Sequence, residues 1–390
     1  MFVMRQLAFI STFPPRKCGI ATFTADVVKN VEKAGEWQCR VVAIEDGIDP
    51  YVPSSNIWFH INQYDRKDYI KAANHINNSD VEAVMIEHEY GIFGGSDGQY
   101  ILELVKLLEK PFAVTCHTVL NSPTMSQRSI LKHLCARADA VVVMTAHAGE
   151  ILHDVYDVEE DKIKVIPHGI PVFRRLSPDY VKSKYALGGR KIISTFGLIG
   201  PGKGLEYAID AMQYVVKKYP DAIYLILGQT HPNLKKRSGE SYREGLEKRV
   251  AGLGLNKNVR FINHFLSLSE LNDYLAATDV YITPYPGKEQ AVSGTLSYAL
   301  GAGKAIVSTP YTYALDILAD NRGILVPFND AGSMGRAICK LLADDKLRHK
   351  LERRAYGYGK HMQWPVVGKS YSDLMLDIAS SFELKLSKEA

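Results

Sequence analysis

At 390 residues the chain is too long for one typical domain, and its composition, 46% hydrophobic and 23% charged, is that of a globular protein with large cores. The net charge of +4, without a run of five like charges, argues against nucleic acid as a partner. It leaves open a weak, peripheral attraction to an anionic membrane surface.

The sequence predicts neither a leader segment nor a membrane span. The opening apolar run, Gln6–Ser11, is only as long as a strand and lacks a small-residue cleavage site. No apolar run approaches the length that crosses a bilayer. The five cysteines are scattered without a C-x-x-C spacing, so we expect reduced thiols in the cytoplasm rather than disulfides or a zinc site.

In the first half, short apolar runs alternate with amphipathic stretches, a pattern typical of a parallel sheet covered by helices. The predicted strands are Gln6–Ser11, Cys39–Ile44, Ile57–Phe59, Ala83–Glu87, Phe112–Cys116, Ala140–Val143 and Ile163–Ile166. The predicted helices lie near Ala21–Ala34, Arg66–Asn77, Gly98–Leu108, Met125–Arg137 and Ala146–Tyr156.

The alternation stops at Gly169–Arg190, a proline- and glycine-containing segment, and restarts at Lys191. The predicted strands of the second half are Ile192–Phe196, Ile223–Leu227, Val259–Ile262, Val280–Thr283, Ala305–Ser308 and Ile324–Val326. The predicted helices lie near Leu205–Lys218, Tyr242–Ala251, Ser269–Ala277, Gly294–Leu300, Ser333–Leu342, Asp345–Gly359 and Pro365–Phe382.

The fold class that this order predicts is α/β, with two Rossmann-like domains facing a cleft. We expect the first domain over residues 1–170, a linker over 171–190 and the second domain over 191–364. A C-terminal helix over 365–390 should pack back on the first domain. Ligands of such sheets bind at the carboxyl ends of the strands, so the loops at these ends are the places to search.

The loop Thr12–Ile20 joins the first predicted strand to the first helix. Gly19 lets the backbone approach a ligand and Arg16 adds positive charge, so this loop is a candidate phosphate or substrate site. Because a single glycine is not a G-x-G-x-x-G set, the dinucleotide fingerprint is absent. The alternative is an ordinary βα turn with solvated basic side chains.

A polar segment, Glu87–Tyr90, ends the fourth predicted strand and leads into a glycine-rich loop. His88, Glu89 and Tyr90 are therefore candidate contacts to an acceptor or a sugar, and the alternative is a solvated loop. A histidine flanked by two acids in an extended segment cannot form a convergent metal-ligand set, so no metal site is predicted.

The next strand ends at His117, whose ring would lie at the ligand edge and could donate or accept hydrogen bonds. A lone histidine is more often structural, but its place one strand away from His88 favours a function. For His168 we prefer the structural interpretation, a contact at the domain hinge.

In the second half, Phe196–Gly204 follows a strand and opens a helix. Its glycines, Gly200 and Gly204 among them, give a flexible turn, and Lys203 directs an ammonium group toward the same point as the helix start. The turn does not match the Walker pattern, because no Gly-Lys-Ser/Thr closes it.

The stretch Tyr281–Ser308 predicts one βαβ unit whose helix begins at Ser293-Gly294-Thr295. Free N–H groups and the positive end of the helix dipole can seat a diphosphate there without a metal, with Lys203 on its other side. Glu289, in the preceding loop, can accept hydrogen bonds from sugar hydroxyls. The alternative is an ordinary crossover with a serine cap.

Taken together, these features resemble the retaining glycosyltransferases of family 4, the group 1 transferases with the GT-B fold, over essentially the whole chain. The likeness rests on Gly19, His117, the turn ending at Lys203-Gly204, Glu289, Ala302-Gly303-Lys304 and the closing Trp-Pro helix. The resemblance implies a donor bound mainly by the C-terminal domain and an acceptor bound mainly by the N-terminal one. It also implies that Lys203 contacts the diphosphate, Glu289 the transferred sugar and His117 the reacting sugar.

The chain departs from the family pattern at two positions. Leu198 stands where the family usually has arginine, and Ser297 stands where it usually has a second glutamate linked to the ribose. Ser297 can still bond a ribose hydroxyl, but more weakly than a carboxylate. The predicted donor-binding set is Gly19, Gly200, Lys203, Gly204, Glu289, Ser293, Gly294, Thr295 and Ser297.

The hypothesis from the sequence is transfer of a mannosyl- or glucosyl-type group from a GDP- or UDP-linked sugar to a hydroxyl of a saccharide or glycolipid. We expect retention at the anomeric carbon, and neither a metal nor another cofactor. The rivals are an epimerase or a glycoside phosphorylase of the same fold and a non-catalytic subunit that binds nucleotide sugar. The donor base, the acceptor and the oligomeric state stay open.

Overall fold

The computed structural model describes residues 4–47, 56–289 and 292–389, so residues 290–291 of the predicted βαβ unit lie outside the described residues. The chain forms two compact units. The first comprises Met1–Gly169 with Met362–Ala390, and the second comprises Ile170–His361.

The first unit contains a parallel sheet with the order β3-β2-β1-β4-β5-β6-β7 in its described part. The strands are β1 (Arg5–Ser11), β2 (Trp37–Glu45), β3 (Ile57–Asn62), β4 (Ala83–His88), β5 (Phe112–Cys116), β6 (Ala140–Val143) and β7 (Ile163–Val165). Helices and single turns connect them: α1 (Gly19–Ala34), α2 (Arg66–Asn77), η1 (Tyr90–Ile92), η2 (Ser96–Gly98), α3 (Ile101–Leu107), α4 (Met125–Arg137), α5 (Ala146–Tyr156) and η3 (Glu160–Lys162).

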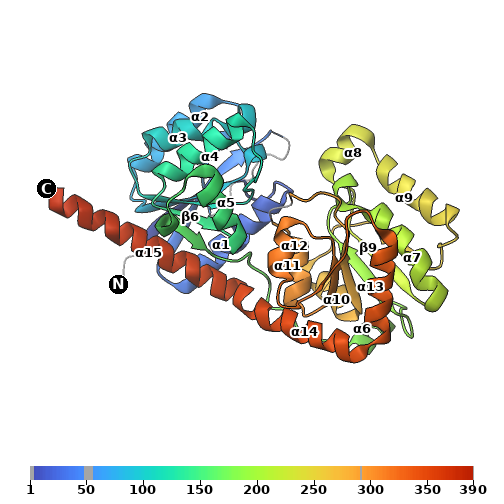
Figure 1. Cartoon of the computed structure of the whole chain (residues 1–390). Helices are drawn as coiled ribbons and strands as arrows, with labels where there is room; N and C mark the ends of the chain where they lie inside the picture. Colours follow the sequence, from blue (N-terminus) through green and yellow to red (C-terminus); the bar gives the residue numbers. More distant parts are fainter. Residues whose placement is uncertain (1–3, 48–55, 290–291, 390) are drawn as a thin grey trace. The chain divides into compact units, whose positions relative to one another are not determined.

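The last helix of the chain, α15 (Trp364–Glu389), belongs to the first unit and packs along α1 (Figure 1). Gly368 allows this close approach, because a Cβ at that position would lie 2.6 Å from Asn30. The indole N–H of Trp37 donates to the carbonyl of Ser372 over 3.1 Å, which ties β2 to the same helix. One face of the first sheet is therefore covered by a segment that is distant in sequence.

The second unit is built in the same way around a parallel sheet with the order β10-β9-β8-β11-β12-β13 among the described residues. Its strands are β8 (Ile192–Phe196), β9 (Ile223–Leu227), β10 (Val259–Ile262), β11 (Val280–Thr283), β12 (Ala305–Ser308) and β13 (Ile324–Leu325). Its helices and turns are α6 (Pro178–Lys184), η4 (Pro201–Lys203), α7 (Leu205–Lys218), α8 (Pro232–Ser238), α9 (Ser241–Gly252), α10 (Leu268–Ala277), α11 (Gly294–Gly301), α12 (Thr312–Ile317), α13 (Ala331–Ala343) and α14 (Asp345–Gly359), and η5 (Lys360–Met362) links it to α15.

The central strands of both sheets are buried on both faces, as in β5 and β9, where every residue is buried. Parallel strands covered by helices on two sides need apolar side chains at successive positions, which explains why their sequences are continuous apolar runs. In each unit the main hydrophobic cluster joins strand residues to the helices that cover them.

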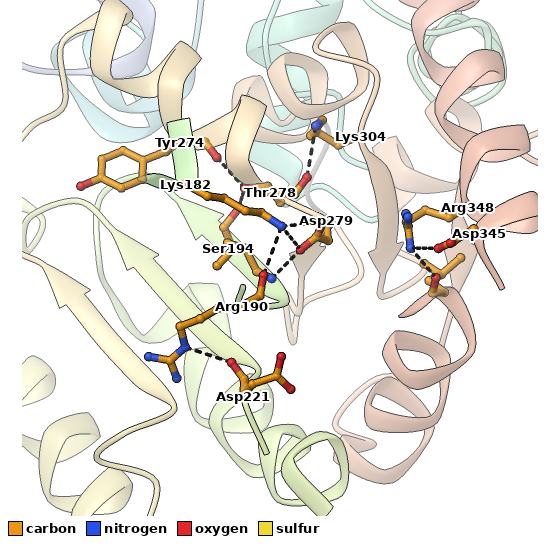
Figure 2. A network of polar contacts seen from close by, with 12 residues as sticks. Lys182, Arg190, Ser194, Asp221, Tyr274, Thr278, Asp279, Lys304, Asp345 and Arg348 are labelled. Carbon is orange, nitrogen blue, oxygen red and sulfur yellow. Dashed lines mark hydrogen bonds and ion pairs between the residues drawn. The ribbon is translucent and has the colours of Figure 1, made fainter. Parts of the chain in front are cut away.

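The predicted linker over 171–190 is wrong, because this segment is part of the second unit. It forms α6, whose Lys182 donates to both carboxylate oxygens of Asp279 over 3.0 and 2.8 Å and to the carbonyl of Arg190 over 3.1 Å (Figure 2). Asp279 also accepts from the N–H of Ile192, and Arg190 donates to the carbonyl of Asp221. These bonds fix the starts of β8, β9 and β11, so proline and glycine in this segment mark turns within a domain.

Among the described helices, none is both long enough and apolar enough to cross a bilayer.

Candidate active site

Lys203 lies in the loop that follows β8, at the carboxyl edge of the second sheet. The next residue, Gly204, has a φ of 60°, and a Cβ there would lie 2.0 Å from the carbonyl oxygen of Pro284. Only glycine fits this approach. The turn therefore holds Lys203 against the loop that follows β11.

Tyr285, in that second loop, is the main partner of Lys203. The ammonium of Lys203 donates to the Tyr285 hydroxyl over 3.0 Å and lies 4.3 Å from the centre of its ring. The Tyr285 side chain is 1% exposed and stacks on Tyr311 with 5.0 Å between ring centroids. The position of the Lys203 charge is thus set by an aromatic ring that is itself fixed in the core.

The start of α11 meets the same point. The Tyr285 hydroxyl shares a hydrogen bond of 2.9 Å with the hydroxyl of Thr295, which lies 3.2 Å from the hydroxyl of Ser293. Ser293 caps the helix by accepting from the N–H of Leu296 over 3.3 Å. One cation, three hydroxyls and the first turn of a helix therefore converge within the second unit, the combination that favours an anion.

The phenol of Tyr285 is electrostatically unusual. Burial opposes its ionisation, but the Lys203 ammonium and hydrogen bonds from Thr295 and Lys203 together hold its pKa below the ordinary value. Burial and Lys203 also lower the pKa of His231, at the end of β9, so that its ring is neutral beside the cation. The His231 ring is therefore close enough to Lys203 to feel its charge.

Ser297 does not face solvent. Its side chain is 0% exposed, and its hydroxyl contacts the Tyr313 hydroxyl at 2.6 Å and donates to the carbonyl of Ser293 over 3.0 Å. The position at which the family usually has a ribose-binding glutamate is enclosed by Tyr313 in this chain. A ribose contact from Ser297 stays a prediction that this packing does not favour.

Glu289 is more accessible than the glycines Gly200 and Gly294, which are half-buried. Glu289 is exposed in the loop before α11 and makes no hydrogen bond or ion pair within the described part of the chain. Gly200 begins the turn that contains Lys203 with an extended backbone, and Gly294 is the first residue of α11.

In the first unit, His117 is paired with a buried acid. Its Nε2 lies 2.8 Å from a carboxylate oxygen of Glu87, and the two side chains are 6% and 0% exposed. With Nε2–H donating to the carboxylate, Nδ1 is left as an acceptor. Phe23 packs edge-on against the ring, with centroids 4.8 Å apart. The ring is therefore oriented by the protein.

His168 belongs to the same aromatic group, through Phe23 at 5.2 Å and Trp364 at 6.2 Å between centroids. Its Nδ1 lies 2.7 Å from the carbonyl oxygen of Gly169. Burial lowers its pKa to about 4, which makes the ring neutral at pH 7. These contacts agree with a structural role.

The three candidates at the end of β4 differ in access. His88 is fully buried, its nitrogens have no hydrogen-bond partner among the described residues, and burial lowers its pKa to about 3. Tyr90 is 8% exposed. Glu89 is partly exposed, and its carboxylate accepts from the N–H of Tyr90 and from the Thr118 hydroxyl. Of the three, Glu89 is the most exposed, and Tyr90 contributes to the lining of a hollow of about 370 Å³.

The Arg16 side chain is bonded to residues of its own unit. Its guanidinium donates to the Gln63 side chain over 3.1 Å and lies 3.4 Å from the carboxylate of Asp46. Gly19 is the first residue of α1, and a Cβ there would meet nothing within 4 Å. Gly19 thus has open space in front of it, while the Arg16 guanidinium is paired with Asp46.

Two residues of the site were missed from the sequence. Tyr285 lies between Pro284 and Pro286 directly after a strand. The two prolines restrict the backbone around a large side chain at the ligand edge of the sheet, and this pattern could have indicated Tyr285 as a site residue. Glu87 was predicted only to belong to the polar segment Glu87–Tyr90, and no role was assigned to it. Alternation along parallel strands places it on the same face as His117, which was the signal for the pair.

Solved structures identify the class of protein that has this fold. The chain is similar to sucrose-phosphate synthase from Thermosynechococcus elongatus, with a TM-score of 0.79 and 17% identity over 97% of this chain and 100% of that one. It is also similar to Anabaena HepE, solved with UDP and glucose, with a TM-score of 0.74 and 12% identity over 96% and 100% of the two chains. The chain has the fold of the GT-B glycosyltransferases, as the sequence predicted.

The family follows from two models that match consecutive parts of the chain. Glycosyltransferase Family 4 matches residues 19–174, and Glycosyl transferases group 1 matches residues 179–358. The chain belongs to the group 1 glycosyltransferases of family 4, which confirms the family that the motifs indicated.

Curated relatives are more distant. A phosphatidyl-myo-inositol mannosyltransferase of Propionibacterium freudenreichii is 25% identical over 67% of this chain and 63% of its own length. The Mycolicibacterium smegmatis protein of the same description is 28% identical over 52% of this chain and 48% of its own. A D-inositol 3-phosphate glycosyltransferase of Corynebacterium glutamicum is 24% identical over 74% and 71%. The chain thus matches less than two thirds of the length of the first two.

Proposed function

We propose that the protein transfers a hexosyl group from a nucleoside-diphosphate sugar to a hydroxyl acceptor, a saccharide or glycolipid, with retention at the anomeric carbon. The observation that carries the proposal is the convergence of Lys203, Tyr285, Thr295 and Ser293 at the start of α11. This arrangement suits a diphosphate because a fixed cation and free helix N–H groups face the same point.

The reaction needs stabilisation of the departing diphosphate. As the bond between the anomeric carbon and the phosphate oxygen breaks, negative charge grows on that oxygen, and the Lys203 ammonium and the α11 N–H groups stabilise it. The acceptor oxygen bonds to the anomeric carbon on the same face, and its proton passes to the departing phosphate oxygen. No metal is required for these steps, since the charges come from the protein.

Tyr285 acts through Lys203. Its hydroxyl holds the ammonium at 3.0 Å and links it to Thr295, so the cation is oriented before the donor binds. Orientation in advance avoids reorganisation when charge develops. Tyr285 is 1% exposed, so we assign it a positioning role.

Two side chains are proposed to contact the transferred sugar. Glu289 is exposed and would accept hydrogen bonds from sugar hydroxyls. His117, with Nε2 paired to Glu87, presents Nδ1 as an acceptor for another hydroxyl. On the acceptor side we propose Glu89, helped by the loop that contains Arg16 and Gly19.

The similar proteins support two classes of donor.

 HepE was solved with UDP and glucose, and the relatives from Propionibacterium freudenreichii and Mycolicibacterium smegmatis are described as mannosyltransferases. We therefore propose a UDP- or GDP-linked glucose or mannose as the donor.

The test is a screen of nucleotide sugars with the full-length chain, in which the release of nucleoside diphosphate is measured with and without saccharide acceptors. We expect slow hydrolysis of one donor and faster release with an acceptor, together with an anomeric product of retained configuration by NMR. If no donor is consumed and no nucleoside diphosphate raises the melting temperature, the proposal is wrong.

One observation favours a second candidate, a subunit that binds nucleotide sugar without turnover. Ser297 is enclosed by Tyr313, and Leu198 supplies no cation, so the donor has fewer protein contacts than the family pattern provides. In the same screen, a rise in melting temperature with a nucleoside diphosphate but no consumption of any donor supports this candidate.

A further inference from the structure

A hollow of about 590 Å³ that is wide open to solvent, with Arg354 and His361 among its exposed lining residues, lies in the second unit. It is formed by the turn Asp320–Arg322, which leads from α12 into β13, and by the end of α14 with His361. Because the turn precedes β13, the hollow is at the amino edge of this parallel sheet, whereas the Lys203 loop is at the carboxyl edge. It is a separate feature of the unit.

The hollow is cationic. The lining contains the guanidinium groups of Arg322 and Arg354 and the carboxylate of Asp320, and the Asp316 carboxylate lies close enough to act on Tyr358. Arg322 stabilises the end of α12, because it donates to the carbonyls of Ile317 and Asp316. It also pairs with Asp320 over 2.8 Å. Those bonds explain its position but leave its charge beside the hollow.

The other donors have few bonds of their own. Arg354 donates once, to the carbonyl of Asp320 over 2.8 Å. Within the described ranges, the Asn321 amide, the His361 ring and the Tyr358 hydroxyl make no hydrogen bond. Burial raises the pKa of Tyr358, so its hydroxyl stays protonated and able to donate. A set of unused donors around a cationic hollow is suited to an anion with several oxygens.

The backbone of the turn is strained at the same place. Asp320 and Asn321 are consecutive non-glycine residues with φ of 54° and 57°. This left-handed conformation is unfavourable for residues with a Cβ, although aspartate and asparagine tolerate it best. Strained residues cluster at ligand sites, and both residues contribute to the lining of the hollow.

We propose that this hollow binds a phosphate monoester, with Arg354 and His361 as its main ligands and the charge of Arg322 behind them. A guanidinium group can donate two parallel bonds to phosphate, which favours this anion over a halide. The volume exceeds that of inorganic phosphate, so the site has room for an attached organic group. The proposal does not depend on the proposed transfer reaction.

The test is calorimetric titration of the full-length chain with inorganic phosphate and with a hexose 6-phosphate, at constant ionic strength set by potassium chloride. The titrations use the Lys203→Ala background, which removes the cation of the proposed diphosphate site. We expect both phosphates to bind, and the unphosphorylated hexose not to bind. Arg354→Gln and His361→Gln should each weaken binding by about 10-fold, as expected for the loss of one good donor.

Arg353→Gln is the matched control, since Arg353 is the exposed neighbour of Arg354 on α14 and does not line the hollow. It should bind phosphate as the parent does. His361→Gln removes no hydrogen bond of the described structure, so a loss in this variant cannot be ascribed to misfolding. The proposal is overturned if Arg353→Gln loses as much phosphate affinity as the test variants do. It is also overturned if Arg354→Gln and His361→Gln both bind phosphate as tightly as the parent.

A second arm distinguishes the source of the phosphate. Vesicles of phosphatidylcholine with and without phosphatidic acid are sedimented with the parent and with Arg354→Gln. Binding that needs both phosphatidic acid and Arg354 supports the site and assigns it to a lipid phosphate, and binding of hexose 6-phosphate alone supports it and assigns a soluble ligand. If neither probe nor inorganic phosphate binds, the proposal is wrong.

Discussion

Removal of one hydroxyl, in Tyr285→Phe, tests whether the Lys203 charge must be held in place. The ring keeps its stack on Tyr311, while the bonds to Lys203 (3.0 Å) and Thr295 (2.9 Å) are lost. A hydrogen bond that involves a charge contributes roughly 1.5–3 kcal/mol. Because the departing phosphate can replace the hydroxyl as the acceptor, we expect about half of this in the transition state, or a fall in kcat of roughly 4- to 13-fold.

The assay is the initial rate of nucleoside diphosphate release at saturating donor, with KM for the donor measured in parallel. A positioning role predicts a lower kcat with little change in KM, because the ammonium is still present in the ground state. Tyr224→Phe is the matched control, since it also removes a buried hydroxyl bond, the one to Thr195 at 3.0 Å, in the same unit. We expect similar losses of melting temperature in the two variants, but normal turnover in the control.

Two results would refute this reasoning. If Tyr285→Phe turns over at the parental rate, the hydroxyl does not orient Lys203 for the reaction. If Tyr224→Phe slows the reaction as much as Tyr285→Phe does, the loss reflects general loosening of the unit.

The remaining predictions concern both units. Lys203→Ala should lower kcat by roughly 10²–10³-fold, as for the loss of an electrostatic stabiliser; near-normal turnover would exclude that role. Glu289→Gln should impair use of the sugar donor while affinity for the bare nucleotide, measured by calorimetry, is kept, and equal losses would indicate a structural acid. Glu87→Gln should lower kcat by about 10-fold through a less firmly oriented His117, whereas an unchanged rate would make the pair structural. His88 has a pKa of about 3 in the folded chain and about 6.5 when unfolded, so only the unfolded state gains a proton between these values. The contribution of neutral His88 to the free energy of unfolding is complete above pH 6.5 and falls by up to ~1.4 kcal/mol per pH unit as the pH drops toward 3. The urea midpoint of His88→Phe should therefore fall less steeply with decreasing pH than that of the parent. An identical pH dependence in the two proteins would contradict the assignment.

Most of the fold was predictable because it depends on local patterns. Continuous apolar runs of strand length, each followed by an amphipathic stretch, indicate parallel strands with covering helices, and this placed the strands and the long helices close to their observed bounds. The helices that were missed, α6, α8 and α12, have only six or seven residues. Two turns are too few to show the hydrophobic periodicity of a helix. In addition, α6 is held in place by the bond between Lys182 and Asp279, which are 97 positions apart.

The site was predictable to the extent that its parts are local motifs. Lys203 was placed by the glycines around it, and Ser293 by the cap that it provides to α11. Tyr285 was missed because its role lies in contacts with residues 82 positions before it and 10 after it. Ser297 seemed available for a ribose, and it is Tyr313, on another helix, that encloses it.

The sequence by itself therefore determined the two parallel sheets, the edges at which ligands are sought and the family, because alternation and short glycine motifs act over a few residues. Only the tertiary structure decided which polar groups meet and which are enclosed. Glu87 and His88 are neighbours in sequence, yet successive strand residues face opposite ways, so one acid pairs with His117 and the next ring is buried in the core. Partnership and burial depend on distant parts of the chain, and a local pattern does not contain them.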